Sequence, residues 1–315
     1  MTRKIAFVYP GQGSQMVGMG KDLYENFSVA KDVFDKADKI LGRKISKICF
    51  EGPEDELKQT INTQPAILVT SIAAFEVLKS KLDVKPDYVA GHSLGEYGAM
   101  YSAGVLSFEN TLKLIQKRAD AMANVQGGSM AAVLNLDEET IKSVLNSVKG
   151  YVAIANYNSL SQIVITGDDE PIKEACDKLL EAGARRVVPL AVSGAFHSSK
   201  MRAAADEFME FEETVEINNA KFPVVTNVDA DFTVDSADFK FKMPLQIYSA
   251  VKWTQSVQNM IDAGVDTFVE IGNGTVLSGL IRKIDKSVKT YNVYDKNSLE
   301  EFVEIYSKEL ENNVR

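Results

Sequence analysis

Histidine and cysteine are scarce in this chain, which has two of each among its 315 residues. Cys49 and Cys176 can form at most one bridge, so a disulfide-stabilised scaffold is excluded. His92 and His197 do not cluster with each other or with the cysteines at the spacing of a zinc site. The sequence therefore predicts no metal and no tightly bound cofactor, and any imidazole chemistry depends on one of these two histidines.

Long apolar runs and an excess of positive charge are also missing. No uninterrupted run approaches the ~20 residues that cross a bilayer. The apolar segment Ile5–Tyr9 is too short for a signal peptide, so we expect a cytoplasmic protein with no membrane contact. The net charge of −9 argues against nucleic acid and against an anionic membrane surface, because both recruit basic proteins.

Segments typical of strands and helices alternate along the chain, which predicts an α/β fold with a mainly parallel sheet. We expect a buried first strand over residues 5–9, a glycine-rich turn after it, and one helix over residues 21–41. Residues 127–192 follow the order βαββαβ, which is that of a ferredoxin-like unit. We therefore predict a large hydrolase-like domain, residues 1–126 and 193–315, with a small ferredoxin-like domain, residues 127–192, inserted into it.

The segment Gly91-His92-Ser93-Leu94-Gly95 matches the G-x-S-x-G pattern of a nucleophile elbow. An apolar strand precedes it and a helix is expected to follow, as the elbow requires. The flanking glycines leave room for a tight turn that exposes the serine hydroxyl. The alternative is a glycine-rich strand-to-helix turn that carries an ordinary exposed serine.

A serine nucleophile needs a base, and His197 is the better candidate. Neighbouring side chains diverge in a tight turn, so His92 is poorly placed to take the proton from Ser93. His197 follows the predicted insert directly, at a domain junction where ligands often bind. The alternative is a histidine that caps a helix or fills the core. No convincing third acid is present, since the aspartates between serine and histidine fit caps or turns; a backbone carbonyl can orient the imidazole instead.

An oxyanion hole needs two N–H donors, which we expect to be the backbone amides of Leu94 and Gln12. The loop that contains Gln12 fits neither the dinucleotide fingerprint nor the P-loop pattern, because Met16 replaces the third glycine and no Gly-Lys-Ser/Thr follows. Arg118 lies among apolar neighbours, so its guanidinium requires an anion. That anion is either the carboxylate of a substrate or a local aspartate in a structural ion pair.

Several motifs occur together and in order over nearly the whole chain. The motifs are Gly11-Gln12-Gly13-Ser14-Gln15, Thr63-Gln64-Pro65-Ala66, Gly91-His92-Ser93-Leu94-Gly95-Glu96-Tyr97, Arg118, Phe196-His197-Ser198 and Thr226-Asn227-Val228. On these motifs the chain resembles malonyl-CoA:acyl-carrier-protein transacylases of bacterial fatty-acid synthesis, and it is similar to the acyltransferase domains of polyketide and fatty-acid megasynthases.

The resemblance implies a ping-pong transfer without a cofactor. Ser93, assisted by His197, would take the malonyl group from malonyl-CoA and pass it to the phosphopantetheine thiol of acyl carrier protein. Arg118 would pair with the free malonyl carboxylate. The resemblance also assigns the remaining site residues: the amides of Gln12 and Leu94 for the oxyanion, Gln64 and Asn158 for the pocket, His92 and Phe196 for malonyl preference, and the backbone carbonyl of Lys252 or a neighbour for orienting His197.

Two other functions remain open at this point. A serine thioesterase or carboxylesterase would use Ser93 and His197 but would not need Arg118. A non-catalytic interaction module on the same fold would need none of the three. We expect a monomer in either case.

Overall fold

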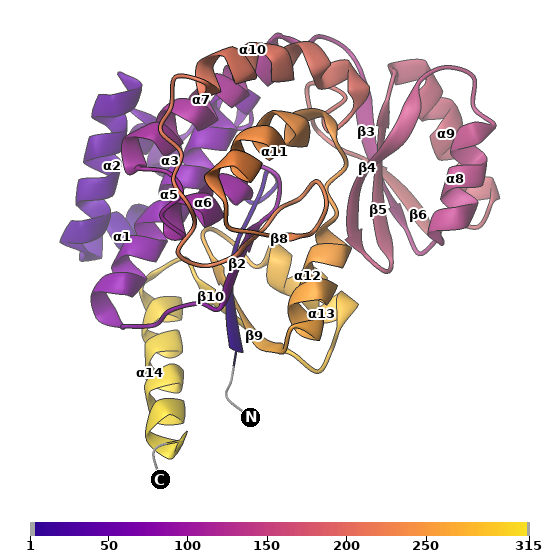
Figure 1. Cartoon of the computed structure of the whole chain (residues 1–315). Helices are drawn as coiled ribbons and strands as arrows, with labels where there is room; N and C mark the ends of the chain where they lie inside the picture. Colours follow the sequence, from indigo (N-terminus) through magenta and orange to yellow (C-terminus); the bar gives the residue numbers. More distant parts are fainter. Residues whose placement is uncertain (1–3, 314–315) are drawn as a thin grey trace.

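A computed structural model describes residues 4–313, with side chains as far as Lys308. Two units lie beside each other (Figure 1). The larger contains both ends of the described chain, and the smaller is built from a continuous middle segment around a second sheet. This is the two-domain arrangement that the sequence predicts, although the boundary residues themselves stay a prediction.

Within residues 4–313, the larger unit is built on a six-stranded sheet. The first five strands run parallel, and the last is antiparallel to its neighbour. In spatial order they are β10 (Lys289–Val293), β9 (Val265–Ile271), β1 (Lys4–Tyr9), β2 (Tyr88–Gly91), β7 (Val224–Val225) and β8 (Phe232–Thr233). The mainly parallel α/β sheet predicted from the sequence is therefore confirmed.

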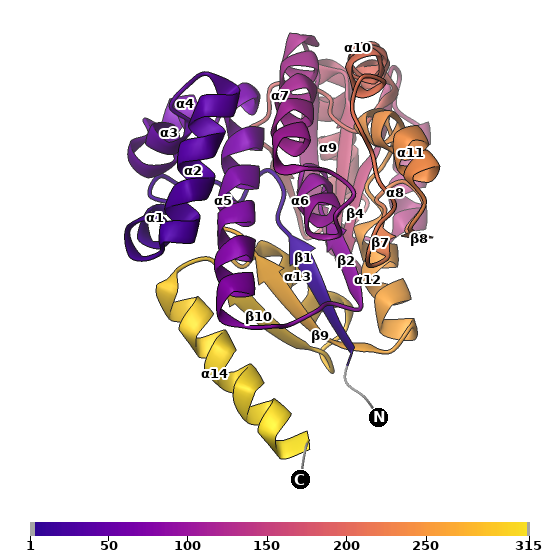
Figure 2. The same cartoon turned by 60° about the vertical axis from the view of Figure 1, so that its left-hand side comes forward.

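Alternating residues of β1 belong to two different cores, one on each face of this sheet. Ala6 and Val8 pack against α12 (Trp253–Asp262) and α13 (Val276–Ile284). Phe7 and Tyr9 belong to the larger core on the other face. The helices of that side and its edges include α1 (Lys21–Asn26), α2 (Ser28–Leu41), α3 (Ile45–Glu51), α4 (Glu54–Leu57), α5 (Thr60–Lys81), α6 (Gly95–Ser102), α7 (Phe108–Asn124), α10 (Arg202–Glu212), α11 (Ser236–Tyr248) and α14 (Lys296–Asn313) (Figure 2).

The central helix of this core is α5. By length and composition it could cross a membrane, but 83% of its apolar window is buried inside the protein. It packs against α7 and α2, and its residues from Ala66 to Leu78 are mostly inaccessible to solvent. The apolar surface of α5 is therefore accounted for by packing within the domain.

The smaller unit is a four-stranded sheet in the described range, with the order β4-β5-β3-β6 and antiparallel pairing throughout. Helices α8 (Glu138–Asn146) and α9 (Asp169–Glu181) pack on it. Along the chain its elements follow the predicted order βαββαβ, so the ferredoxin-like prediction is confirmed. The strands are β3 (Ser129–Leu134), β4 (Val152–Ser159), β5 (Gln162–Gly167) and β6 (Arg186–Pro189).

Strand β4 joins the two units. The backbone N–H of Val251, just before α12, donates to Ala155 O at 2.8 Å, and the N–H of Tyr157 donates to Val251 O at 2.9 Å. A short parallel bridge is thereby formed between Asn156 and Val251. The contact fixes the small sheet against the end of the large domain where the candidate site lies.

The prediction of a single helix over residues 21–41 is wrong. Phe27 is extended, with φ −133°, and divides the segment into α1 and α2. The side chain of Asn26 donates to the Asp22 backbone carbonyl at 2.8 Å, which is the local bonding by which asparagine competes with a continuing helix. Phe27 itself packs against the large core.

Candidate active site

The turn between β2 and α6 has the geometry of a nucleophile elbow. Ser93 has φ 52°, in the left-handed region that non-glycine residues rarely adopt. A Cβ on Gly91 would lie 2.0 Å from the backbone of Gly95, and a Cβ on Gly95 would lie 2.2 Å from Tyr9 O. Both glycines are therefore required by the close approach of backbone to backbone.

We expect Gly95→Ala to destabilise the fold by more than about 4 kcal/mol, because backbone atoms of β1 have no room to move away from the new Cβ. Gly279→Ala in α13 is the matched control, since a Cβ there meets nothing within 4 Å. The control is expected to gain about 0.5–1 kcal/mol from helix propensity. Chemical denaturation of both variants measures the difference; equal stabilities would contradict the prediction.

His197 faces the elbow from the segment that follows β6. Its Nε2 lies 2.7 Å from Ser93 Oγ. Its Nδ1 lies 3.1 Å from both Gln246 O and Ser249 O, so these carbonyls accept its hydrogen and orient the ring. The prediction that Lys252 provides this carbonyl is wrong. Lys252 caps α12, where its carbonyl accepts from the N–H of Ser256 at 2.9 Å.

The surroundings of His197 keep its ring neutral. The residue is 5% exposed, and burial, together with the charges of Arg118 and His92, lowers the pKa of His197 to about 3. Its φ of 54° is left-handed, like that of Ser93. With Nδ1 bonded to carbonyl oxygens, the proton belongs on Nδ1 and the lone pair on Nε2 faces the serine hydroxyl. This is the tautomer that a general base needs.

Arg118 reaches the serine from α7 and is 1% exposed. Its Nη1 donates to Gln64 Oε1 at 2.6 Å, and its Nη2 donates to Ser93 Oγ at 3.1 Å and to Gln246 Oε1 at 3.0 Å. Its Nε has no partner among the described residues. Burial lowers the pKa of Arg118, yet a guanidinium stays protonated in proteins.

No structural ion pair explains this arginine. Among the described residues, no carboxylate lies within 4 Å of the guanidinium of Arg118, and the alternative of a local aspartate partner is therefore wrong. The oxygens that it contacts belong to neutral groups. A buried positive charge held by neutral acceptors beside a candidate nucleophile can receive an anion.

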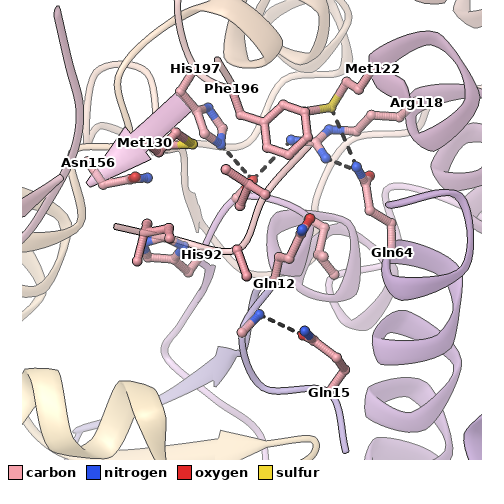
Figure 3. Close-up of a pocket in the computed structure, with 16 residues that line it drawn as sticks. Gln12, Gln15, Gln64, His92, Arg118, Met122, Met130, Asn156, Phe196 and His197 are labelled. Carbon is pink, nitrogen blue, oxygen red and sulfur yellow. Dashed lines mark hydrogen bonds between the residues drawn. The ribbon is translucent and has the colours of Figure 1, made fainter. Parts of the chain in front are cut away.

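Ser93, His197 and Arg118 meet in a cavity of about 250 Å³ between the two domains. In Figure 3, His197 and Arg118 approach the centre of the cavity from opposite sides, and Gln12 lies across from them. Both domains contribute to the wall. The lining residues are Gln12, Gly13, Gln15, Gln64, His92, Ser93, Leu94, Arg118, Met122, Met130, Asn156, Leu190, Ala191, Val192, Phe196 and His197.

Two further predicted pocket residues, His92 and Phe196, line this cavity, but Asn158 does not. Asn158 lies behind His92, with its Oδ1 2.8 Å from His92 Nε2. Asn156 is the residue of β4 that faces the cavity. Residues two apart in a regular strand point to the same face, which would place both asparagines in the cavity wall. A register irregularity in β4 between Tyr157 and Ser159 interrupts this alternation, so Asn156 and Asn158 have different neighbours.

The two amides predicted for the oxyanion hole also belong to the cavity wall. Leu94 is the N-cap of α6, and Gln12 follows β1. Within the described chain, no protein acceptor takes the N–H of either residue. The Gln12 loop is anchored to the loop after β9, because Asn273 Nδ2 donates to Ser14 O at 2.6 Å. Two free N–H groups beside a serine hydroxyl can bind the oxyanion of an acyl transfer.

The acyl transferase domain family matches residues 6–313 of this chain. The chain belongs to the acyltransferase family. Its curated relatives include the malonyl CoA-acyl carrier protein transacylases of Bacillus subtilis and Staphylococcus aureus. The first is 44% identical over 98% of this chain and 99% of the relative, and the second 43% identical over 92% and 95%.

Solved acyltransferase structures share the whole fold. A malonyl CoA-acyl carrier protein transacylase from Clostridium perfringens is 35% identical, with a TM-score of 0.95 over 99% of this chain and all of that one. A malonyl-transacylase in complex with a type II polyketide acyl carrier protein is 37% identical, with a TM-score of 0.93 over 96% of this chain and 99% of that one.

In this acyltransferase, sequence reasoning missed Gln246, which contacts all three central residues. Its side-chain oxygen accepts from Arg118, its amide donates to Ser93 O at 3.0 Å, and its backbone carbonyl accepts from His197. No local motif marks it, because it lies inside α11, just after Pro244. Asn227 belongs to the motif Thr226-Asn227-Val228, but nothing in that motif predicts its contact with the serine.

Proposed function

We propose that this acyltransferase moves a malonyl group from malonyl-CoA to the phosphopantetheine thiol of an acyl carrier protein, through a malonyl ester on Ser93, in fatty-acid synthesis. The observation that carries the proposal is the buried guanidinium of Arg118, which has no carboxylate within 4 Å among the described residues and donates to Ser93 Oγ at 3.1 Å. A malonyl group has a second carboxylate, which can pair with this guanidinium next to the ester. The names of the curated relatives support the same donor and acceptor.

The first half-reaction begins when His197 Nε2 takes the proton of Ser93 Oγ. The serine oxygen attacks the thioester carbonyl, and the amides of Gln12 and Leu94 stabilise the resulting oxyanion. The intermediate collapses by breaking the carbon–sulfur bond, and the protonated His197 returns its proton to the departing CoA thiolate. Malonyl-Ser93 and CoA thiol are the balanced products.

The second half-reaction reverses these roles. The carrier thiol gives its proton to His197 and attacks the ester carbonyl, and the serine oxygen leaves with the proton from His197. The same amides hold the second oxyanion. Throughout, Arg118 holds the distal carboxylate through charge-assisted hydrogen bonds and so fixes the acyl carbonyl over the serine.

The orientation of His197 by carbonyls rather than a carboxylate suits this exchange. The carbonyls of Gln246 and Ser249 fix the tautomer without adding negative charge to a site that must admit a malonyl carboxylate.

The site is complete in one chain, so we propose that a monomer is active. Both cysteines are free thiols, in keeping with the reducing cytoplasm that we propose as its location.

Incubation with malonyl-CoA in the absence of carrier protein tests the proposal, with the intact mass as the readout. We expect a stable malonyl adduct that maps to Ser93. Acetyl-CoA is expected to label the wild type far more slowly, and malonyl-CoA is expected to give no adduct with Ser93→Ala. Free malonate that accumulates without an adduct would instead identify a hydrolase. Absence of both adduct and malonate would return the interaction module to consideration.

A further inference from the structure

A buried carboxylate lies directly behind the nucleophile and has no part in the reaction described so far. Glu96 belongs to the first turn of α6 and is 1% exposed. Its Oε2 accepts the backbone N–H of Asn227 at 2.6 Å. Since the two residues are 131 positions apart in sequence, this bond joins the helix after the elbow to the loop after β7.

Asn227 in turn holds the elbow on both sides of the serine. Its side-chain Oδ1 accepts the backbone N–H of Ser93 at 2.8 Å, and its Nδ2 donates to Gly91 O at 2.7 Å. The left-handed φ of Ser93 costs free energy that only its surroundings can offset. Asn227 is therefore one of the groups that maintain the strained turn, and its own backbone is fixed by Glu96.

We propose that Glu96 is a positioning residue of the transfer reaction: its carboxylate fixes the Asn227 backbone, and Asn227 holds Ser93 in the turn that aims the hydroxyl at His197. As a role in malonyl transfer this rests on the proposed function, whereas the effect on the reactivity of Ser93 does not. A charged acceptor binds the Asn227 N–H more strongly than a neutral one does. The precision of the elbow therefore depends on the ionisation of Glu96.

The environment of Glu96 makes that ionisation accessible near neutrality. Burial raises the pKa of Glu96 to about 7, opposed by the Asn227 N–H, by Gln246 of α11 and by the charge of Arg118 on α7. The other titratable groups that face it are Asp229, from the loop after β7, and Tyr97 of its own helix. Asp229 is itself paired with Lys242 at 2.7 Å.

The sign of the pH dependence follows from these surroundings. Above about pH 7 Glu96 is mostly a carboxylate, and below it mostly a neutral acid. The hydrogen bond that Glu96 accepts from the Asn227 N–H therefore weakens as the pH falls. His197 does not titrate in that range, because its pKa is lowered to about 3. A loss of serine reactivity with a midpoint near neutral pH therefore does not come from the base. Burial also raises the pKa of Glu212 on α10 to about 7, and its charge acts on Tyr97, so the variant Glu96→Gln assigns the loss to Glu96.

Single-turnover rates between about pH 5.5 and about pH 8.5 test the proposal. One reaction is malonylation by malonyl-CoA, and the other is phosphonylation of Ser93 by a fluorophosphonate, which needs the serine and its base but no malonyl pocket. We expect both wild-type rates to fall below about pH 7. Glu96→Gln keeps the shape of the side chain and a neutral acceptor. We expect both reactions of this variant to be about tenfold slower than in the wild type at high pH, and their rates not to fall below about pH 7. Glu96→Ala is expected to be about 100-fold slower.

Glu270→Gln is the matched control. Glu270 is also a buried carboxyl whose pKa is raised by burial, and it accepts the N–H groups of Leu277 and Ser278 at the start of α13. We expect its substitution to lower the melting temperature without altering either pH profile.

The proposal is overturned if Glu96→Gln retains the fall below about pH 7, or if it reacts at the wild-type rate throughout. Phosphonylation that follows the expected pattern in a wild type that never accepts malonyl would support the role of Glu96 and refute the proposed function. Malonylation and phosphonylation that both follow the pattern support the two together.

Discussion

Arg118→Ala is expected to slow malonylation of Ser93 about a thousandfold and to leave acetylation by acetyl-CoA at least as fast as in the wild type. Removing one partner of a buried charge pair costs about 4 kcal/mol, which corresponds to that factor. Acetyl-CoA has no second carboxylate and loses nothing. Since the charge of Arg118 helps to lower the pKa of His197, its removal also makes the base slightly stronger.

The measurement is the pre-steady-state rate of adduct formation with each thioester. Arg118→Lys keeps the charge but loses the planar fork that reaches Gln64, Gln246 and the substrate together, so we expect it to recover only part of the malonyl rate. Equal losses for malonyl and acetyl groups would show that Arg118 serves only the fold or the serine, and would favour an esterase.

Replacing His197 with glutamine is expected to slow malonylation by about four orders of magnitude. The 2.7 Å contact between Nε2 and Ser93 Oγ is the proposed route by which the proton leaves the serine, and glutamine can occupy the space without accepting a proton at neutral pH. Residual activity would come from the oxyanion donors and from substrate positioning. Quenched-flow mass spectrometry of the adduct gives the rate.

His92→Gln is the matched control, because it replaces the other histidine of the same cavity. His92 contacts Asn158 rather than the serine oxygen, and burial lowers the pKa of His92 as well. We expect its loss to be at least about 100-fold smaller than that of His197→Gln. Similar losses for the two variants would contradict the assignment of His197 as the base.

The parts of the site that a short segment encodes could be predicted from the sequence. The spacing of Gly91, Ser93 and Gly95 follows from the steric limits of one turn, and those limits apply before any tertiary contact forms. Arg118 was identifiable because a charged residue interrupts the apolar face of a helix. The scarcity of histidine, together with the place of His197 at the end of the predicted insert, then left it as the candidate base.

Other contacts could not be predicted, because they depend on segments that meet only in the folded chain. The orienting carbonyls belong to Gln246 and Ser249, at the end of α11, and any residue type can present a backbone carbonyl. The family resemblance implies Lys252 or a neighbour, and no side-chain pattern in the sequence could correct it. The last strand of the predicted insert, residues 127–192, shows a similar limit: β6 ends at Pro189, and Leu190, Ala191 and Val192 line the cavity instead.

The bridge between Asn156 and Val251 joins the domain that holds Ser93, His197 and Arg118 to one that contributes other residues to the cavity wall. The insert supplies Met130, Asn156 and residues 190–192 to the cavity, whereas the nucleophile, the base and the arginine belong to the scaffold around it. Part of the cavity wall and the proposed catalytic groups are thus encoded in separable stretches of the gene. Exchange of the predicted insert, residues 127–192, between acyltransferases offers a way to reshape that part of the wall while Ser93, His197 and Arg118 are inherited unchanged.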